Sequence, residues 1–139
     1  MVYFFMTKEH ICEGVVLHCI DFRFRKILND YLSSRFPNGY DLISVAGGVK
    51  PLLADNGENN FVLEQFKVSN RLHRPEKIIL IQHEDCGAYG GSATFGDFDA
   101  EQNFQKAELE KAEEFLKRHF SRQNIEKYLF CLSGEIIAL

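Results

Sequence analysis

Short apolar runs alternate with longer amphipathic stretches along the 139 residues of this chain. The runs are rich in β-branched residues and are bounded by glycine, proline or polar residues, which is typical of buried β-strands. The run at residues 77–82 is continuously apolar at its centre and therefore predicts a strand that is covered on both faces. The pattern as a whole predicts strands at residues 14–20, 40–46, 77–82, 127–133 and 135–139.

Three intervening stretches carry apolar residues at the spacing of an amphipathic α-helix. They predict helices at residues 25–36, from about 60 to 73, and from about 99 to 120. Pro37-Asn38-Gly39 ends the first helix and Pro75 ends the second. The segment 87–96 holds four glycines but is too irregular for a phosphate-binding loop, and we interpret it as a loop at a functional site.

The alternating order of these elements predicts an α/β fold in three layers, with helices on both faces of the sheet. We expect a mostly parallel four-stranded sheet in the order 2-1-3-4 with right-handed crossovers, extended by a short C-terminal strand. A single domain is expected over residues 1–139. In such a sheet, ligands bind beyond the carboxyl ends of the first and third strands, where the strand order switches.

The composition narrows the classes of partner. A formal net charge of -4 and the lack of a long Lys/Arg cluster argue against nucleic acid. Apolar residues make up 45% of the chain, enough for one core, yet no run approaches the roughly 20 apolar residues of a membrane helix. Residues 1–6 are apolar but lack the basic flank and length of a signal peptide, so a cytoplasmic location is expected.

Four cysteines in a reducing compartment point to metal binding, catalysis or plain burial before disulfides. Cys19 lies at the end of the first predicted strand, whereas His83 and Cys86 follow the third. Two thiols and one imidazole suit Zn²⁺ and leave a fourth coordination position open, which is the pattern of a catalytic zinc site. The fold therefore predicts that the three side chains meet at the switch point of the sheet.

Charged residues follow Cys19 at alternate positions. Because side chains alternate along an extended segment, we expect Cys19, Asp21 and Arg23 to share one face. His18 and Ile20 would then share the other face. This alternation predicts that a thiolate, a carboxylate and a guanidinium lie together.

These residues form two motifs, Cys19-x-Asp21-x-Arg23 and His83-x-x-Cys86-Gly87, and the pair resembles the β-class carbonic anhydrases. The similarity extends over most of the chain. Residues 44–47 (Ser-Val-Ala-Gly) lie where the family usually carries Arg-Asn-Ala-Gly, and the predicted hairpin at Gly134 also fits. The chain departs from the family pattern at Phe22, where serine is common, at the lost Arg-Asn pair, and in its short length.

The resemblance implies a carbonic anhydrase-like zinc lyase (carbonate dehydratase). Cys19, His83 and Cys86 would bind zinc, and a zinc-bound hydroxide would hydrate carbon dioxide reversibly to bicarbonate. Asp21 and Arg23 would form a dyad beside the metal. In some family members the aspartate instead binds zinc as a fourth ligand and closes the site, so Asp21 is also a candidate ligand. The resemblance further implies a homodimer or a dimer of dimers.

Other titratable residues receive structural interpretations. Glu84 and Asp85 are expected to be exposed loop charges. Asp85 could instead support the metal site indirectly, by contacting the residues around its ligands. Tyr89 could line the pocket, relay a proton or simply pack. The remaining cysteines and histidines are interpreted as buried hydrophobic residues (Cys12, Cys131), solvated surface residues (His10, His73, His119) and a side chain packed on the opposite strand face (His18).

Alternative functions stay open at this point. The same site could hydrolyse a carbon dioxide analogue such as carbonyl sulfide, or the fold could serve as a non-catalytic zinc-binding protein. Asp21 and Arg23 could be an ordinary ion pair. A metal-free mechanism with Cys86 as nucleophile and His83 as base is a further alternative, but it leaves Cys19 without a role.

Overall fold

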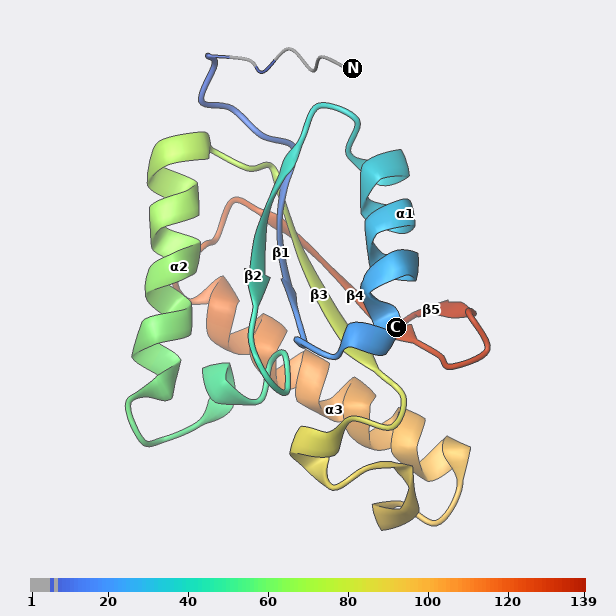
Figure 1. Cartoon of the computed structure of the whole chain (residues 1–139). Helices are drawn as coiled ribbons and strands as arrows, with labels where there is room; N and C mark the ends of the chain where they lie inside the picture. The colour runs from blue at the N-terminus through green and yellow to red at the C-terminus, as the bar shows by residue number, and fades with distance from the viewer. Residues whose placement is uncertain (1–5, 7) are drawn as a thin grey trace.

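The structure, a computed structural model, describes residue 6 and residues 8–139, and its centre is a five-stranded sheet in the order β2-β1-β3-β4-β5 (Figure 1). The strands are β1 (Gly14–His18), β2 (Tyr40–Ser44), β3 (Lys77–His83), β4 (Asn124–Phe130) and β5 (Ile136–Ala138). The α-helices are α1 (Arg25–Arg35), α2 (Glu58–His73) and α3 (Phe98–Lys117). Single 3-10 turns are η1 (Phe22–Phe24), η2 (Pro51–Leu53), η3 (Gly87–Tyr89) and η4 (Ser92–Thr94).

The expected strand order 2-1-3-4 is confirmed. β1 pairs in parallel with β2 and β3, β3 pairs in parallel with β4, and β5 is antiparallel to β4. The carboxyl ends of β1 and β3 consequently lie side by side at one edge of the sheet, where η1 and the turns after β3 also lie (Figure 1). This is the switch point at which a ligand site was expected.

Most strand boundaries differ from the sequence prediction by one to three residues, and two of the differences affect the description of the sheet and the site. β4 begins at Asn124, three residues before the predicted start at residue 127, because residues 124–126 pair with residues 77–79 of β3. β1 ends at His18, so the predicted extended segment does not reach Cys19. The polar residues Asn124 and Glu126 hid the start of β4, whereas the apolar residues Cys19 and Ile20 extended the predicted first strand beyond its actual end.

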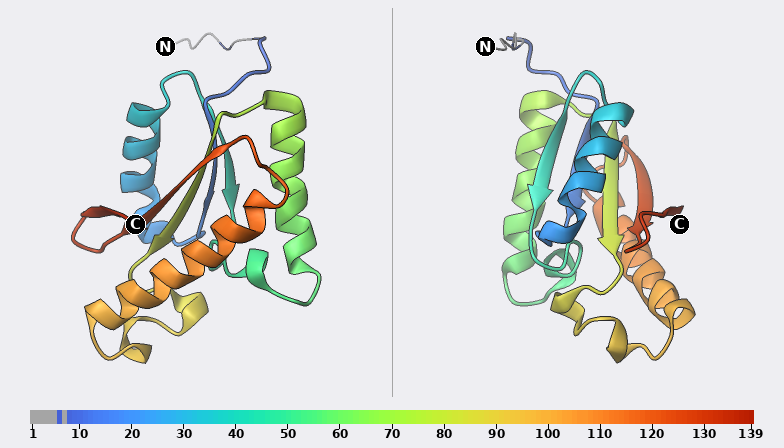
Figure 2. Two further views of the ribbon diagram at one scale, coloured as in Figure 1. Left: turned by 180° about the vertical axis from the view of Figure 1, so that it is seen from behind. Right: turned by 45° about the vertical axis from the view of Figure 1, so that its right-hand side comes forward.

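Side chains from the two faces of the sheet form two separate hydrophobic clusters. The cluster under α2 and α3 includes Leu17, Phe66 and Leu116, and the cluster under α1 includes Leu32 and Phe130. Figure 2 shows α1 on one face of the sheet and α2 with α3 on the other, which confirms the three layers. A sheet buried on both faces explains why β1 is apolar without alternation.

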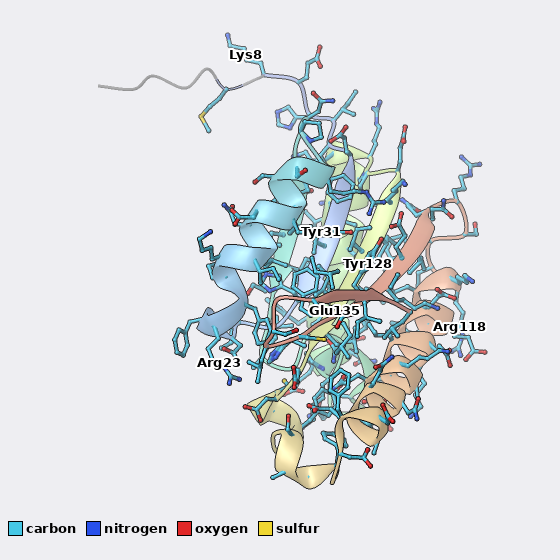
Figure 3. All side chains as sticks on the ribbon, turned by 90° about the vertical axis from the view of Figure 1, so that its right-hand side faces the viewer. Lys8, Arg23, Tyr31, Arg118, Tyr128 and Glu135 are labelled. Atoms are coloured by element: carbon cyan, nitrogen blue, oxygen red, sulfur yellow. The ribbon has the colours of Figure 1, made fainter. Side chains whose placement is uncertain are left out.

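A polar cluster fastens α1 to β4. Arg35 Nη2 donates to both carboxylate oxygens of Glu126, at 2.7 and 2.6 Å. Arg35 Nη1 donates to the hydroxyl of Tyr128 at 3.0 Å. Lys77 Nζ adds a bond of 3.1 Å to Glu126. Figure 3 shows Tyr31 beside Tyr128, and their ring centroids lie 5.6 Å apart. The cluster holds Glu126 in its ionised form.

The Glu126→Gln substitution is expected to lower the free energy of unfolding by about 1–2 kcal/mol at neutral pH, because it leaves Arg35 with a neutral partner. Burial alone would raise the Glu126 pKa, but the bonds from Arg35, Tyr128 and Lys77 outweigh it and lower the pKa from 4.5 to about 2. A lowered pKa stabilises the folded state above pH 4.5, and this contribution is lost as the pH falls toward 2.

Urea denaturation of both proteins at stepwise lower pH measures this effect. The difference between wild type and Glu126→Gln should shrink between pH 4.5 and about 2. The exposed Glu110 on α3 is the matched control, since Glu110→Gln should leave the free energy of unfolding unchanged at every pH. A pH-independent difference for Glu126→Gln would contradict the charge-based account.

Among the described residues, no helix is both long enough and apolar enough to cross a membrane. The expectation about residues 1–6 concerns a segment that, apart from Met6, lies outside the described residues.

Candidate metal centre

Three donor side chains converge at the carboxyl ends of β1 and β3. Cys19 is the first residue after β1, His83 is the last residue of β3, and Cys86 follows three residues later. Their ligand atoms all lie within 4.8 Å of one another, and all three residues are buried. The structure therefore brings together the three residues that the sequence pointed to as metal ligands.

The orientation of the His83 ring suits a metal ligand. Its Nδ1 donates a hydrogen bond of 2.7 Å to the carbonyl oxygen of Glu84, which fixes the tautomer and leaves a lone pair on Nε2. His83 is only 4% exposed, and its Nε2 has no hydrogen-bond partner in the described part of the chain. The Phe24 ring, 4.4 Å away between centroids, holds the imidazole in place. A buried polar nitrogen without a partner is energetically costly, so this atom is well suited to bind a metal ion.

The two sulfurs have the separation that a shared zinc ion would impose. Cys19 Sγ and Cys86 Sγ lie 4.0 Å apart, and two thiolates bonded to one tetrahedral zinc at about 2.3 Å would lie about 3.8 Å apart. The contact with Cys86 is the main cause of a lowered pKa of the Cys19 thiol, and the nearby His83 ring and the backbone N–H of Gly47 lower it further. Charge on Cys19 and burial in turn raise the pKa of Cys86. The donor set fits zinc, which would allow both thiolates to exist together.

Arg23 holds the Asp21 carboxylate beside these donors. Arg23 Nε donates to Asp21 Oδ1 at 3.1 Å, and Nη2 donates to Oδ2 at 2.7 Å. These bonds lower the Asp21 pKa from 3.8 to about 2, so the carboxylate is ionised at neutral pH. Asp21 Oδ2 lies 3.9 Å from His83 Nε2. Asp21 thus lies at the edge of the donor cluster, and its ionised carboxylate is fixed there by hydrogen bonds from Arg23.

The route by which these residues meet differs from the predicted strand alternation. The chain leaves the extended conformation after His18, and Asp21 caps the 3-10 turn η1 by accepting a 3.0 Å hydrogen bond from the backbone N–H of Arg23. The prediction that strand alternation places Cys19, Asp21 and Arg23 on one face is therefore wrong. A turn, and not an extended strand, brings Asp21 to Arg23.

Asp85 is a second anchor for Arg23, not a free loop charge. Its Oδ2 accepts a 3.0 Å bond from Arg23 Nη1, its backbone oxygen accepts a 2.9 Å bond from Nη2, and its Oδ1 accepts a 2.8 Å bond from the Ser92 N–H. Glu84 is likewise engaged, since its Oε2 accepts a 2.7 Å bond from the Leu132 N–H. Arg23 consequently joins η1 to the turn after β3 (Figure 3 shows Arg23 at this end of the molecule).

Gln82 supports the site through hydrogen bonds to the loop at residues 47–49, a role that was not predicted from the sequence. Gln82 Oε1 accepts a 3.0 Å bond from the Val49 N–H, while Nε2 donates to Gly47 O at 3.2 Å and to Gln105 Oε1 at 3.0 Å. The Gly48 backbone approaches so closely, at a φ of +59°, that a Cβ there would lie 2.1 Å from Gln82 Oε1. The available sequence signal was a glutamine at the end of the apolar run 77–82, and the structure shows that this side chain is buried.

Other titratable residues take structural roles. The Tyr89 hydroxyl donates a 3.1 Å bond to Glu108, and burial raises its pKa, which agrees with packing. Burial, with some repulsion from Arg25, lowers the His18 pKa to about 4, so His18 is neutral. Cys131 is buried, as expected. His73 is a correction: it is not freely solvated, because its Nδ1 donates a 2.7 Å bond to Asp41.

Comparison with protein families gives a match over nearly the whole chain. A family model described as "Putative carbonic anhydrase" matches residues 9–135. The uncharacterized protein RC0076 of Rickettsia conorii is 22% identical over 142 residues, which cover 94% of this chain and 76% of that protein.

Solved structures show the same fold. A carbonic anhydrase from Streptococcus mutans has a TM-score of 0.62 at 14% identity, over 96% of this chain and 87% of that chain. The β-carbonic anhydrase isoform I of Trichomonas vaginalis has a TM-score of 0.57 at 15% identity, over 99% and 87% of the two chains. A tetrameric β-carbonic anhydrase of Sordaria macrospora has a TM-score of 0.63 at 13% identity, over 94% and 82%.

Proposed function

The chain belongs to the carbonic anhydrase family, as a short and divergent member with the β-class fold, and we propose that it catalyses the reversible hydration of carbon dioxide to bicarbonate. Cys19, His83 and Cys86 would hold zinc. The observation that carries this proposal is the convergence of these three buried donors within 4.8 Å, beside a carboxylate that is fixed by an arginine. We also propose that residues 1–139 act as one domain, since both hydrophobic clusters pack on one sheet.

Zinc bound at this site would supply the positive charge that makes water acidic near neutral pH. Asp21 would accept a hydrogen bond from the reacting water and orient its lone pair toward carbon dioxide. Because Arg23 keeps the Asp21 pKa near 2, Asp21 stays an acceptor over the whole working range of pH. Arg23 also occupies both Asp21 oxygens, which favours the dyad over Asp21 as a fourth metal ligand.

The pocket beside the dyad supports an apolar substrate. Its walls include the side chains of Ile20, Phe22, Ala46 and Ala88, together with the backbone of the glycine-rich turn that begins at Gly87. Carbon dioxide is small and uncharged, so apolar walls favour it over bicarbonate, while Arg23 at the rim favours the anionic product. The expected site loop thus contributes to the proposed substrate pocket.

We propose a homodimer or a dimer of dimers. The Sordaria macrospora enzymes are tetrameric, and Phe22 beside the pocket is 84% exposed in the single chain. A large apolar side chain at that position is costly to leave in water and suits a contact between copies. A cytoplasmic location is proposed as well, because all four cysteines are free.

Stopped-flow hydration of carbon dioxide by the zinc-loaded protein tests the proposed function. Turnover is expected above the buffer background, and it should fall as the pH is lowered through neutrality, because the attacking hydroxide would be protonated to water. Asp21 is not the group that titrates there, since its pKa lies near 2. A flat pH profile would contradict the proposal.

The same assay separates the alternatives. A zinc-loaded protein whose turnover equals the background, and equals that of Asp21→Asn, would indicate a non-catalytic zinc-binding protein. Faster turnover of carbonyl sulfide than of carbon dioxide would indicate a hydrolase. Protein that takes up no zinc at Cys19, His83 and Cys86 would overturn the metal-dependent mechanism altogether.

A further inference from the structure

A second group of donor side chains lies at the opposite edge of the sheet from the candidate metal centre. Cys12, Asp41 and His73 offer a sulfur, a carboxylate oxygen and an imidazole nitrogen within 4.8 Å of one another. In Figure 1 the amino ends of β1 and β2 and the C-terminal end of α2 lie at the top, whereas η1 and the turns after β3 lie at the bottom. The two groups are therefore separated by the length of the sheet.

The backbone fixes the three donors independently of any ion. Cys12 stands two residues before β1, and its N–H donates a 3.0 Å bond to the carbonyl oxygen of His73, the last residue of α2. Asp41 is the second residue of β2, paired in register with Val15 of β1. Three segments that are distant in the sequence thus present their side chains to one point.

The side chains already share one proton-bridged contact. His73 Nδ1 donates a 2.7 Å bond to Asp41 Oδ2, and the Ser69 hydroxyl donates a second 2.7 Å bond to the same oxygen. The Cys12 thiol lies alongside, 3.4 Å from the Gly14 carbonyl oxygen. All three donors are half-buried, so an ion could enter from solvent and still lose much of its water.

We propose that Cys12, Asp41 and His73 form a second divalent-cation site of the zinc class. A thiolate and a carboxylate carry two negative charges, which one divalent cation neutralises, and the mixed sulfur, nitrogen and oxygen set suits zinc better than magnesium or calcium. The cation would replace the proton that His73 shares with Asp41 and also the proton of the Cys12 thiol, which would be released to solvent on binding. The His10 ring, 5.5 Å from the His73 ring between centroids, is the nearest further imidazole for a fourth position.

Such an ion would act as a cross-link. It would tie the segment before β1 to the end of α2 and to β2, at an edge of the sheet far from the dyad. Binding of a ligand to the folded state alone raises stability by mass action. The second ion is therefore expected to raise the melting temperature without changing hydration of carbon dioxide.

Equilibrium dialysis of the full chain against micromolar free zinc tests the site. Wild type is expected to bind one zinc at each of its two clusters. Cys12→Ser and His73→Gln should each lose one equivalent and keep carbon dioxide hydration at the wild-type rate. The matched controls Cys131→Ser and His119→Gln should keep both equivalents, because neither residue belongs to a donor cluster among the described residues.

Cobalt binding separates this site from the proposed catalytic site. In Cys86→Ser, a thiolate-to-cobalt absorption band should remain, and it should disappear in the Cys12→Ser/Cys86→Ser double variant. Zinc should raise the melting temperature of Cys86→Ser but not that of the double variant. A wild type that binds a single zinc, with Cys12→Ser unchanged, would show that His73 and Asp41 form only a hydrogen-bonded pair and would overturn the second site.

Discussion

Cys86→Ser is expected to lose the zinc ion proposed to bind at Cys19 and His83, and to hydrate carbon dioxide no faster than buffer. Cys86 contributes a thiolate whose sulfur lies 4.0 Å from that of Cys19. A serine hydroxyl is a poor zinc ligand because it stays protonated at neutral pH, so only two good donors would remain. Stopped-flow hydration, together with metal analysis after dialysis, measures both losses on the same sample.

Cys131→Ser is the matched control for this substitution. Cys131 is 4% exposed and Cys86 is 2% exposed, so both changes bury a hydroxyl in place of a thiol. The control should keep its zinc and its turnover, even if its melting temperature falls. A Cys86→Ser protein that retains wild-type hydration would remove Cys86 from the proposed ligand set.

Arg23→Ala is expected to keep zinc but to lower kcat by about 10²-fold or more, in the range found when an electrostatic or proton-handling group is removed. Arg23 is not one of the three proposed metal ligands, so the affinity for zinc should be unchanged. Without the guanidinium, Asp21 loses the bonds of 3.1 and 2.7 Å that hold it, and its carboxylate, 3.9 Å from His83 Nε2, is free to move toward the donors.

Lys26→Ala serves as the comparison, since Lys26 is a cation on α1 that pairs with Asp30 in solvent. Its removal changes the net charge equally and should leave kcat unchanged. Single-turnover and steady-state rates of both variants, with zinc content measured in parallel, provide the measurement. Equal kcat values for wild type and Arg23→Ala would show that Asp21 and Arg23 are an ordinary ion pair.

The fold and the convergence of the three donor residues can be predicted from the sequence, and the reason is physical. Parallel strands with continuous apolar cores place their carboxyl ends at one edge, so residues that follow β1 and β3 must be neighbours. Cys19, His83 and Cys86 could therefore be brought together from spacing alone. Their role as zinc ligands stays a prediction.

The partners of Arg23 and the cluster at Cys12 could not be found in this way. Asp85 reaches Arg23 because its own backbone takes a φ of +59°, a turn conformation that leaves little trace in the sequence. Cys12, Asp41 and His73 meet through strand register and the end of a helix, and none of them forms a local motif. Contacts of this kind depend on tertiary geometry and not on apolar periodicity.

The separation of Cys19 and Cys86 by 67 positions has a consequence for how the protein matures. β1 is paired on both sides, and each parallel neighbour is reached only through a helical crossover, so the donors meet after both crossovers have closed. Long-range pairing of this kind forms late and slowly during folding. The metal would therefore be acquired by an already assembled chain, and the apoprotein should be a stable, loadable precursor.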